Sequence, residues 1–254
     1  MAGFREPFLR VLREGLEWLE LSLPEAALEA MARHAEMVRV WNERVNLTAV
    51  VAPEAMAARH FVDSLTVLLA LREPGWPPRP AEWPARRLAD VGSGAGFPGL
   101  VLKVAWPALA VTLIESVGKK ARFLEAVVSA LDLEGVAVLA QRAEAVGQDL
   151  GHRERYDVAI ARAVAALPVL LEYLLPLIRL GGVAVAMKGP EVDEELAAAR
   201  GALDRLGGAL RERRDLAWPP HLPPRTLLII EKIAPTPANY PRRPGIPEKR
   251  PLRS

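Results

Sequence analysis

A run of alternating glycines follows a short apolar segment and has the residue types of a ligand-binding loop. Residues 88–99 read Leu-Ala-Asp-Val-Gly-Ser-Gly-Ala-Gly-Phe-Pro-Gly. Glycine adopts positive φ angles that other residues avoid, so Gly92, Gly94 and Gly96 let the backbone lie flat against a ligand. Pro98 suits the first turn of a helix, where exposed N–H groups attract a carboxylate or a phosphate.

An acid at the end of the next apolar run extends this pattern. Residues 111–114 are Val-Thr-Leu-Ile, and Glu115 follows them. An acid about 20 residues after a glycine loop meets the ribose hydroxyls in nucleotide sites. The sixth position counted from Gly92 is Phe97, so the dinucleotide fingerprint Gly-x-Gly-x-x-Gly is not met. The spacing Gly-x-Gly-x-Gly resembles motif I of the Rossmann-like class I methyltransferases, which bind S-adenosylmethionine. The alternative interpretation is an ordinary tight strand-to-helix turn.

Composition narrows the possible chemistry. The chain has 254 residues, 51% of them hydrophobic and 25% charged, which is ordinary globular composition. The absence of cysteine excludes disulfides, thiolate metal sites and cysteine nucleophiles, including those that methylate carbon 5 of pyrimidines. The four histidines lack metal-ligand spacing, so no metal is expected. No signal peptide or membrane-spanning run is visible, and a cytoplasmic protein is expected.

The elements that would position these groups divide the chain into four parts. Residues 1–72 have helical apolar spacing, and residues 53–71 in particular predict one helix beginning at Pro53. Residues 73–85 contain five prolines and predict a linker. Residues 86–237 alternate apolar runs with helical ones, and residues 238–254 form a basic, proline-rich tail.

The alternation over residues 86–237 predicts an α/β fold with a mostly parallel seven-stranded sheet. The expected strands are 87–91, 110–115, 135–140, 156–161, 182–187, 209–217 and 226–233, and the last two form an antiparallel hairpin. The expected helices are 98–105, 118–131, 142–150, 166–180 and 190–207. This is the topology of a class I S-adenosylmethionine-dependent methyltransferase, preceded here by an N-terminal helical region.

Further segments carry a closer resemblance. They are Asn46–Val50, Arg59–Leu65 (Arg-His-Phe-Val-Asp-Ser-Leu), Ser116–Leu124, Ala161-Arg-Ala163 and the tail Tyr240–Leu252. Together they resemble the RsmG family, once called GidB, over roughly residues 30 to 252. That family transfers a methyl group to N7 of a guanosine in 16S, small-subunit, ribosomal RNA. The resemblance implies an rRNA (guanine-N7-)-methyltransferase whose partner is that RNA or its ribonucleoprotein particle.

The resemblance also implies roles for individual residues. The methionine end of the cofactor would meet Gly92, Ser93, Gly94, Phe97 and Gly99, and Glu115 would hold the ribose. Ser116 and Val117 would flank the adenine, and Ala143 and Glu144 would contact its edge. Arg162 would line the acceptor face beside the cofactor and position the acceptor. The RNA contacts would be Asn46, Arg59, His60, Lys188, Arg242, Arg243, Gly245, Lys249 and Arg250.

Several of these residues have a simpler structural interpretation. Phe97 could be a core residue, Glu144 a solvated acid and Arg162 a surface ion-pair arginine. Asn46 could cap a helix, and His60 could be a packed histidine.

Guanine N7 carries a lone pair and no proton, so this reaction needs no general base. The chain agrees, since residues 161–165 read Ala-Arg-Ala-Val-Ala and offer no carboxylate to accept a proton. The tail carries five basic residues and one acid, which suggests a polyanionic partner, while charge alone is equally compatible with a disordered, solubilising terminus. A small-molecule methyltransferase and a non-catalytic RNA-binding protein remain as alternatives, and a monomer is expected.

Overall fold

Seven strands form a single sheet in the order β3-β2-β1-β4-β5-β7-β6. The computed structural model describes residues 2–72, 80, 84, 86–216 and 224–252. The strands are β1 Arg87–Val91, β2 Ala110–Ile114, β3 Val136–Leu139, β4 Tyr156–Arg162, β5 Ile178–Lys188, β6 Gly208–Leu216 and β7 Arg225–Lys232. Strands β1 to β5 pair in parallel, whereas β7 is antiparallel to both β5 and β6. The predicted α/β sheet with a terminal antiparallel hairpin is confirmed.

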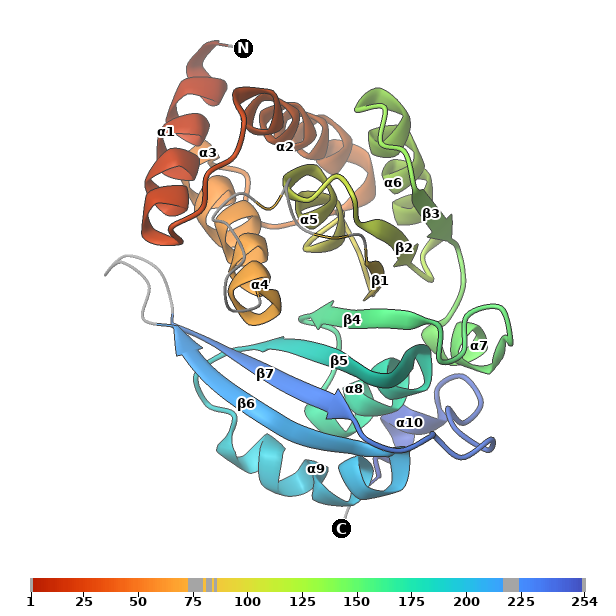
Figure 1. Cartoon of the computed structure of the whole chain (residues 1–254). Helices are drawn as coiled ribbons and strands as arrows, with labels where there is room; N and C mark the ends of the chain where they lie inside the picture. The colour runs from red at the N-terminus through yellow and green to blue at the C-terminus, as the bar shows by residue number, and fades with distance from the viewer. Residues whose placement is uncertain (1, 73–79, 81–83, 85, 217–223, 253–254) are drawn as a thin grey trace.

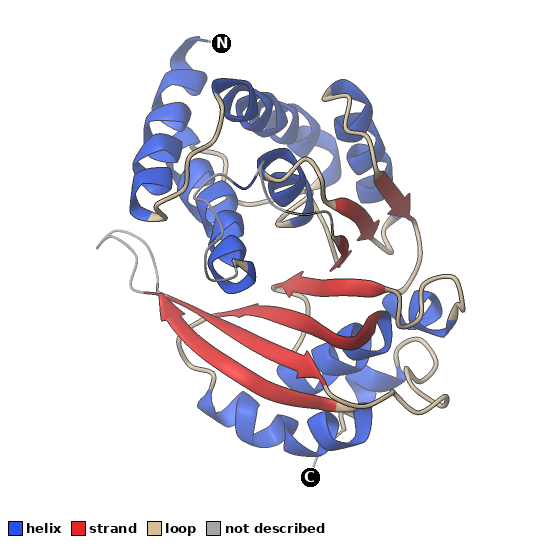
Figure 2. Ribbon diagram, in the orientation of Figure 1, coloured by secondary structure: helices blue, strands red, loops and turns tan. Residues whose placement is uncertain are grey.

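Helices cover both faces of the sheet (Figures 1 and 2). One face carries α1 Ala2–Trp18, α2 Glu25–Val45, α3 Pro53–Met56, α4 Asp63–Leu71, α5 Gly99–Ala105 and α6 Gly118–Ala130. The other carries α7 Ala143–Gln148, α8 Leu167–Leu174, α9 Asp193–Leu206 and α10 Ile246–Lys249. None of the described helices is long and apolar enough to cross a membrane.

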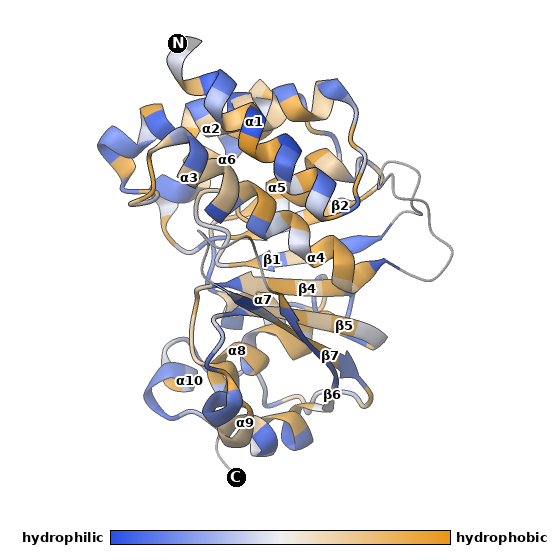
Figure 3. Ribbon diagram, turned by 90° about the vertical axis from the view of Figure 1, so that its left-hand side faces the viewer, coloured by the Kyte–Doolittle hydropathy of each residue, from blue (hydrophilic) through white to orange (hydrophobic). Residues whose placement is uncertain are grey.

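Alternate residues of the central strands supply two separate cores. Leu88 and Val158 belong to the core shared with the N-terminal helices, while their neighbours Ala89 and Ala159 belong to the core under α8 and α9. The central strands are therefore buried on both sides, as a parallel sheet requires, whereas the edge strands β3 and β6 are mostly half-buried or exposed. Strands β4 and β5 are largely hydrophobic (Figure 3).

The register brings the predicted site together. Val91, the last residue of β1, lies beside Ile114 of β2 and Ala161 of β4. The glycine loop, Glu115 and Arg162 directly follow these three residues, so all three meet at the carboxyl end of the sheet. Ligands of open α/β sheets bind at this edge.

Three elements differ from the sequence prediction, and one of them is α10, a short helix in the tail where none is expected. The helix expected from Pro53 through Leu71 contains a π-helical segment at Ala57–Val62, which connects α3 to α4. Strand β5 begins at Ile178 rather than 182, because Pro176 ends the preceding helix early in a 3-10 turn. The predicted linker at 73–85 lies outside the described residues, apart from Pro80 and Pro84.

Candidate functional site

The glycine loop adopts the conformation that its sequence predicts. The φ angles of Gly92, Gly94 and Gly96 are 72°, 56° and 88°, all in the left-handed region. A Cβ atom on Gly92 would lie 2.6 Å from a side-chain methyl carbon of Val164, in the loop after β4. Only glycine combines this positive φ angle with so close an approach to Val164.

Glu115 is buried and fixed by two backbone donors. Its Oε2 accepts a hydrogen bond from the N–H of Gly94 at 3.0 Å, and its Oε1 accepts one from the N–H of Val117 at 2.7 Å. A carboxylate has about four acceptor positions. Glu115 therefore connects the glycine loop to the end of β2 and keeps acceptor capacity for a pair of ligand hydroxyls.

Asp90 lies beneath the same loop. Its carboxyl group is fully buried, and its Oδ2 accepts a hydrogen bond from the N–H of Gly99 at 3.0 Å. Its Oδ1 has no hydrogen-bond partner among the described residues. Burial raises the pKa of Asp90 to about 7. Asp90 lines neither of the cavities described below, and its contact with Gly99 joins the end of β1 to the start of α5.

A cavity of about 520 Å³ opens beside the loop. It lies between the glycine loop, the π-helical segment and the ends of β4, β5 and β7. Five cationic side chains line it, Arg59, Lys120, Arg162, Lys188 and Arg225. Such a cavity favours an anionic or acceptor-rich occupant.

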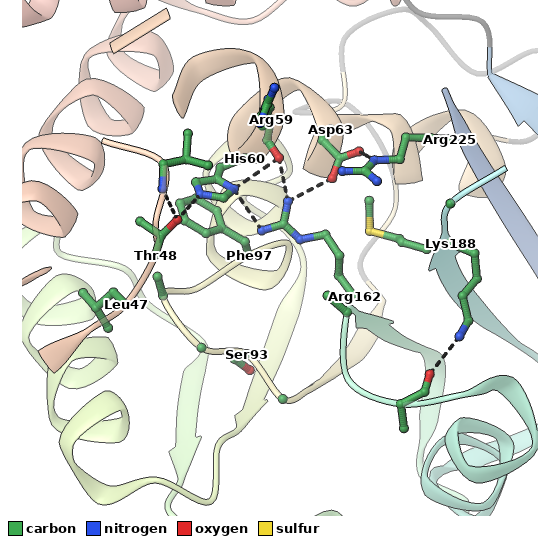
Figure 4. Close-up of a pocket in the computed structure, with 18 of the residues that line it drawn as sticks. Leu47, Thr48, Arg59, His60, Asp63, Ser93, Phe97, Arg162, Lys188 and Arg225 are labelled. Carbon is green, nitrogen blue, oxygen red and sulfur yellow. Dashed lines mark hydrogen bonds and ion pairs between the residues drawn. The ribbon is translucent and has the colours of Figure 1, made fainter. Parts of the chain in front are cut away.

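Arg162 is held in this cavity by several partners (Figure 4). Its Nη1 donates to the backbone oxygen of Arg59 and to Oδ2 of Asp63, both at 2.9 Å. Asp63 also accepts a hydrogen bond from Nε of Arg225 at 2.9 Å through its other oxygen. One buried carboxylate, 6% exposed, thus orients two arginines from different strands.

Aromatic rings form the wall next to Arg162. The ring of Phe97 is 5% exposed and stacks against His60, with ring centroids 4.7 Å apart, and the Arg162 guanidinium lies 5.3 Å from its centre. Thr48 Oγ1 is 2.7 Å from Nε2 of His60. Burial, and then the charge of Arg162, lower the pKa of His60 to about 4. His60 is therefore a neutral ring at physiological pH.

His34 reaches the loop from α2. It is fully buried, its Nε2 is 2.8 Å from the backbone oxygen of Ala95, and its ring stacks on Phe97 with centroids 5.1 Å apart. The N-terminal helices thus contact the glycine loop directly.

A second cavity, of about 70 Å³, lies on the other side of Gly92. Its wall includes Ser116, Ala143 and Glu144, which the sequence predicts to surround an adenine. Glu144 is 3% exposed, and its Oε1 accepts a hydrogen bond from the N–H of Gly245 at 2.9 Å. Gly92 belongs to the walls of both cavities, so one ligand that crosses the glycine loop could reach both.

The predicted site residues fall into three groups: those that line the larger cavity, those that line the smaller one, and those that line neither. Gly92, Ser93, Gly94, Phe97, Arg59, His60, Arg162 and Lys188 line the larger cavity, and Ser116, Ala143 and Glu144 line the smaller one. Glu115, Val117 and Gly99 adjoin the loop. Asn46, Arg242, Arg243, Gly245, Lys249 and Arg250 line neither cavity, and Asn46 is the C-terminal cap of α2.

Two predicted cations have partners within the protein. Nζ of Lys188 donates to the backbone oxygen of Ala165 at 2.8 Å and to Glu195 at 2.6 Å. Arg242 forms an ion pair with Glu172 at 2.5 Å, and Glu172 is fully buried. The charge of Arg242 therefore holds the tail against α8. Because this charge is already paired, Arg242 is a weaker candidate for a phosphate contact than the sequence predicts.

Sequence reasoning missed several residues of the two cavities. Asp63 stands in the quoted segment Arg59–Leu65. An acid among the apolar residues of a helix could have indicated a buried, paired carboxylate. Thr48 stands in the quoted segment Asn46–Val50, in which only Asn46 was assigned a role, and Arg225 had no distinguishing pattern. Tyr173 and Glu248 enter the smaller cavity from α8 and α10, which no local pattern connects.

The strand order, the glycine loop and the acid after β2 define a Rossmann-like class I methyltransferase that uses S-adenosylmethionine. A family model described as "GidB: rRNA small subunit methyltransferase G" matches residues 27–211, and the chain belongs to this family.

Individual relatives agree with this assignment. A "Ribosomal RNA small subunit methyltransferase G" of Roseiflexus sp. (strain RS-1) is 49% identical over 232 residues, which are 91% of this chain and 94% of the relative. The protein of that name from Symbiobacterium thermophilum is 47% identical over 248 residues, covering 95% and 97%.

Proposed function

We propose that this protein transfers a methyl group from S-adenosylmethionine to N7 of a guanosine in small-subunit ribosomal RNA. The observation that carries the proposal is the cation-rich larger cavity and its single carboxylate. Among the described residues lining that cavity, Asp63 is the only acid, and both of its oxygens accept hydrogen bonds from arginines. No carboxylate there is placed to take a proton.

The residues that line the larger cavity favour some methyl-acceptor atoms of the RNA bases over others. An amine must lose a proton when it is methylated, whereas a ring nitrogen with a lone pair does not. In its major-groove edge guanine presents two acceptors, O6 and N7, while adenine presents an acceptor and a donor. A cavity lined by cations therefore favours the guanine edge.

The cofactor-binding part of the proposal rests on the fit of the loop. Gly92, Ser93, Gly94 and Phe97 would hold the methionine end, and Glu115 would accept hydrogen bonds from the ribose hydroxyls. Bound S-adenosylmethionine would supply an electrophilic methyl group. The chain would contribute orientation and exclusion of water rather than proton transfer.

Arg162 is proposed to position the acceptor. Three contacts, to Arg59, Asp63 and His60, fix its guanidinium, and its Nε–H has no partner among the described residues. That donor would suit guanine O6 and leave the N7 lone pair available for attack. His60, neutral and stacked on Phe97, would not compete for a proton.

Phosphate contacts would come from exposed cations around the larger cavity and on the tail. Arg59 lies at the cavity, and Arg243, Lys249 and Arg250 are exposed on the tail. Asn46 and Gly245 are retained as candidate RNA contacts on resemblance alone. The proposal further includes a monomer that acts in the cytoplasm without a metal ion, on RNA or on its ribonucleoprotein particle.

The test is transfer of labelled methyl from S-adenosylmethionine to small-subunit ribosomal RNA, supplied naked and as assembled particles. The modified nucleoside is then identified by mass spectrometry. N7-methylguanosine at one site would support the proposal. Transfer to neither substrate, with cofactor binding intact, would contradict it and favour a small-molecule acceptor.

A further inference from the structure

The basic tail folds back on the protein next to the smaller cavity. Arg153, which precedes β4, donates four hydrogen bonds to backbone oxygens, of which three belong to Thr236, Pro237 and Tyr240 at 2.6–3.1 Å. The Arg242–Glu172 ion pair and the bond from Gly245 to Glu144 continue this attachment. Residues 236–250 are therefore packed against the rest of the protein by specific hydrogen bonds and an ion pair. Helix α10 lies beside α7 and α8 (Figure 1).

This attachment places Glu248 of α10 in the wall of the smaller cavity. The hydroxyl of Tyr173 donates to Oε1 of Glu248 at 3.4 Å. Burial and the charges of Glu144 and Glu248 raise the pKa of Tyr173, so its hydroxyl stays protonated and remains a donor. Two carboxylates, from α7 and α10, thus face one small cavity.

The other walls of the cavity suit a flat aromatic ring. Val164 and Gly92 lie on one side, and Ser116 follows Glu115 in the loop after β2. Val164 is 36% exposed, which is unusual for a branched apolar side chain beside buried strands. Arg142 also lines the cavity, so the carboxylates are not the sole charges there.

We propose that Glu248, together with Glu144, binds the exocyclic amine of the adenine ring, and that the C-terminal tail is thereby an element of the cofactor site. This inference rests on the proposed use of S-adenosylmethionine. The adenine amine has two N–H donors, and two carboxylates from different elements match them. A purine with an oxygen at the same position would present an acceptor to these carboxylates and would be repelled.

The test compares two ligands that differ at this position. S-adenosylhomocysteine carries the amine, and S-inosylhomocysteine carries a carbonyl oxygen instead. Dissociation constants of both are measured by calorimetry for the whole chain, for Glu248→Gln, and for Glu194→Gln. The last is a control that makes the same chemical change at an exposed position on α9.

We expect the unmodified chain and the control to prefer the adenosyl ligand equally. In Glu248→Gln, affinity for the adenosyl ligand should fall by about tenfold, the loss of a hydrogen bond to a charged group. Affinity for the inosyl ligand should rise, because one of the two carboxylates that repel its carbonyl oxygen is replaced by an amide that can donate to it. An unchanged preference would overturn the inference and leave the proposed function standing. Failure of the unmodified chain to bind either ligand would overturn the cofactor assignment, and this inference with it.

Proteolysis of the unmodified chain provides a second measurement that requires no variant. The bond after Lys249 lies directly next to Glu248, and trypsin cleaves there. S-adenosylhomocysteine should slow this cleavage several-fold relative to cleavage after Arg10 on α1. Equal rates with and without the ligand would overturn the inference.

Discussion

The carboxylate shared by Arg162 and Arg225 provides the sharpest mutational test of the acceptor site. Each arginine donates to a different oxygen of Asp63 at 2.9 Å. In Asp63→Asn one oxygen becomes an NH₂ group, which cannot accept a hydrogen bond and faces a guanidinium. The side chain keeps its shape, so the change removes charge and one acceptor without creating a cavity.

The expected magnitudes follow from these two contacts. A hydrogen bond to a charged group contributes about 1.5–3 kcal/mol, and the substitution removes one and weakens the other, for a loss of roughly 3 kcal/mol. For a chain of this size that loss lowers the Tm by roughly 10 °C. Release of Arg162 should reduce kcat/KM for the RNA by about ten- to a hundredfold, since small misplacements of a positioning group are costly. The Kd for S-adenosylmethionine should change by less than about twofold, because Asp63 does not touch the glycine loop.

The assay is methyl transfer to the RNA at a temperature where every variant is folded, with cofactor affinity measured separately. Asp157→Asn is the matched control. Asp157 accepts hydrogen bonds from Nε of Arg179 at 2.8 Å and from the N–H of Arg87 at 2.7 Å, near the amino end of β4. It should lose stability and keep its activity. If both variants lost stability and both kept full activity, Asp63 would be a structural residue, and our reasoning on Arg162 would be refuted.

Three further predictions concern the loop, the buried histidines and the tail. Gly92→Ala places a Cβ atom 2.6 Å from a neighbouring methyl carbon at a φ of +72°, and should weaken binding of S-adenosylmethionine by about tenfold or more in calorimetry. His34 and His60 each have a pKa lowered to about 4, chiefly by burial. The unfolded chain therefore binds protons that the native chain does not, and the unfolding free energy in urea should fall between pH 6.5 and 4, by at most about 3 kcal/mol per histidine. Arg242→Ala leaves Glu172 buried without its partner and should reduce the unfolding free energy by about 3–5 kcal/mol.

Each of these has a control and a contradicting result. Gly3→Ala adds a Cβ atom in open space, and equal cofactor affinity in both glycine variants would refute the account of the loop. His60→Gln should reduce the pH dependence below 6.5, and an identical slope would exclude His60 as its source. Arg243→Ala, at an exposed position, should change stability by less than about 0.5 kcal/mol. A similar small effect of Arg242→Ala would show that the buried ion pair contributes little.

The parts of the fold that can be predicted from the sequence are those that depend on residues close together in the chain. Apolar runs bounded by turn residues locate β1, β2 and β4 to within a residue or so. The loop conformation follows because glycine spacing and positive φ are properties of single residues. Glu115 is predictable for the same reason, since it directly follows β2, the next strand after the loop.

The parts that sequence reasoning missed depend on contacts between distant segments. Asp63 and Arg225 are 162 residues apart, and Arg242 lies 70 residues from Glu172. The charge of the tail is visible in its composition, but the partner of each cation is not. Glu172 gave an indication of its own, because it is the single charged residue of the apolar helix Leu167–Leu174. The π-helical segment at Ala57–Val62 has ordinary helical apolar spacing, and no residue type marks it.

The bonds from Arg153 to the tail carry a consequence for how the protein is made. Synthesis proceeds from the N-terminus, and domains fold as their segments leave the ribosome. Three of the four carbonyl groups that Arg153 binds lie 83–87 residues later in the chain, and Leu252, further along the same segment, is buried. Helices α7 and α8 are therefore synthesised well before the segment that packs against them, and they gain this packing partner only once residues 236–240 have been made. A chain that stopped between Lys232 and Thr236 would retain every strand and still lack the tail segment that packs on α7 and α8.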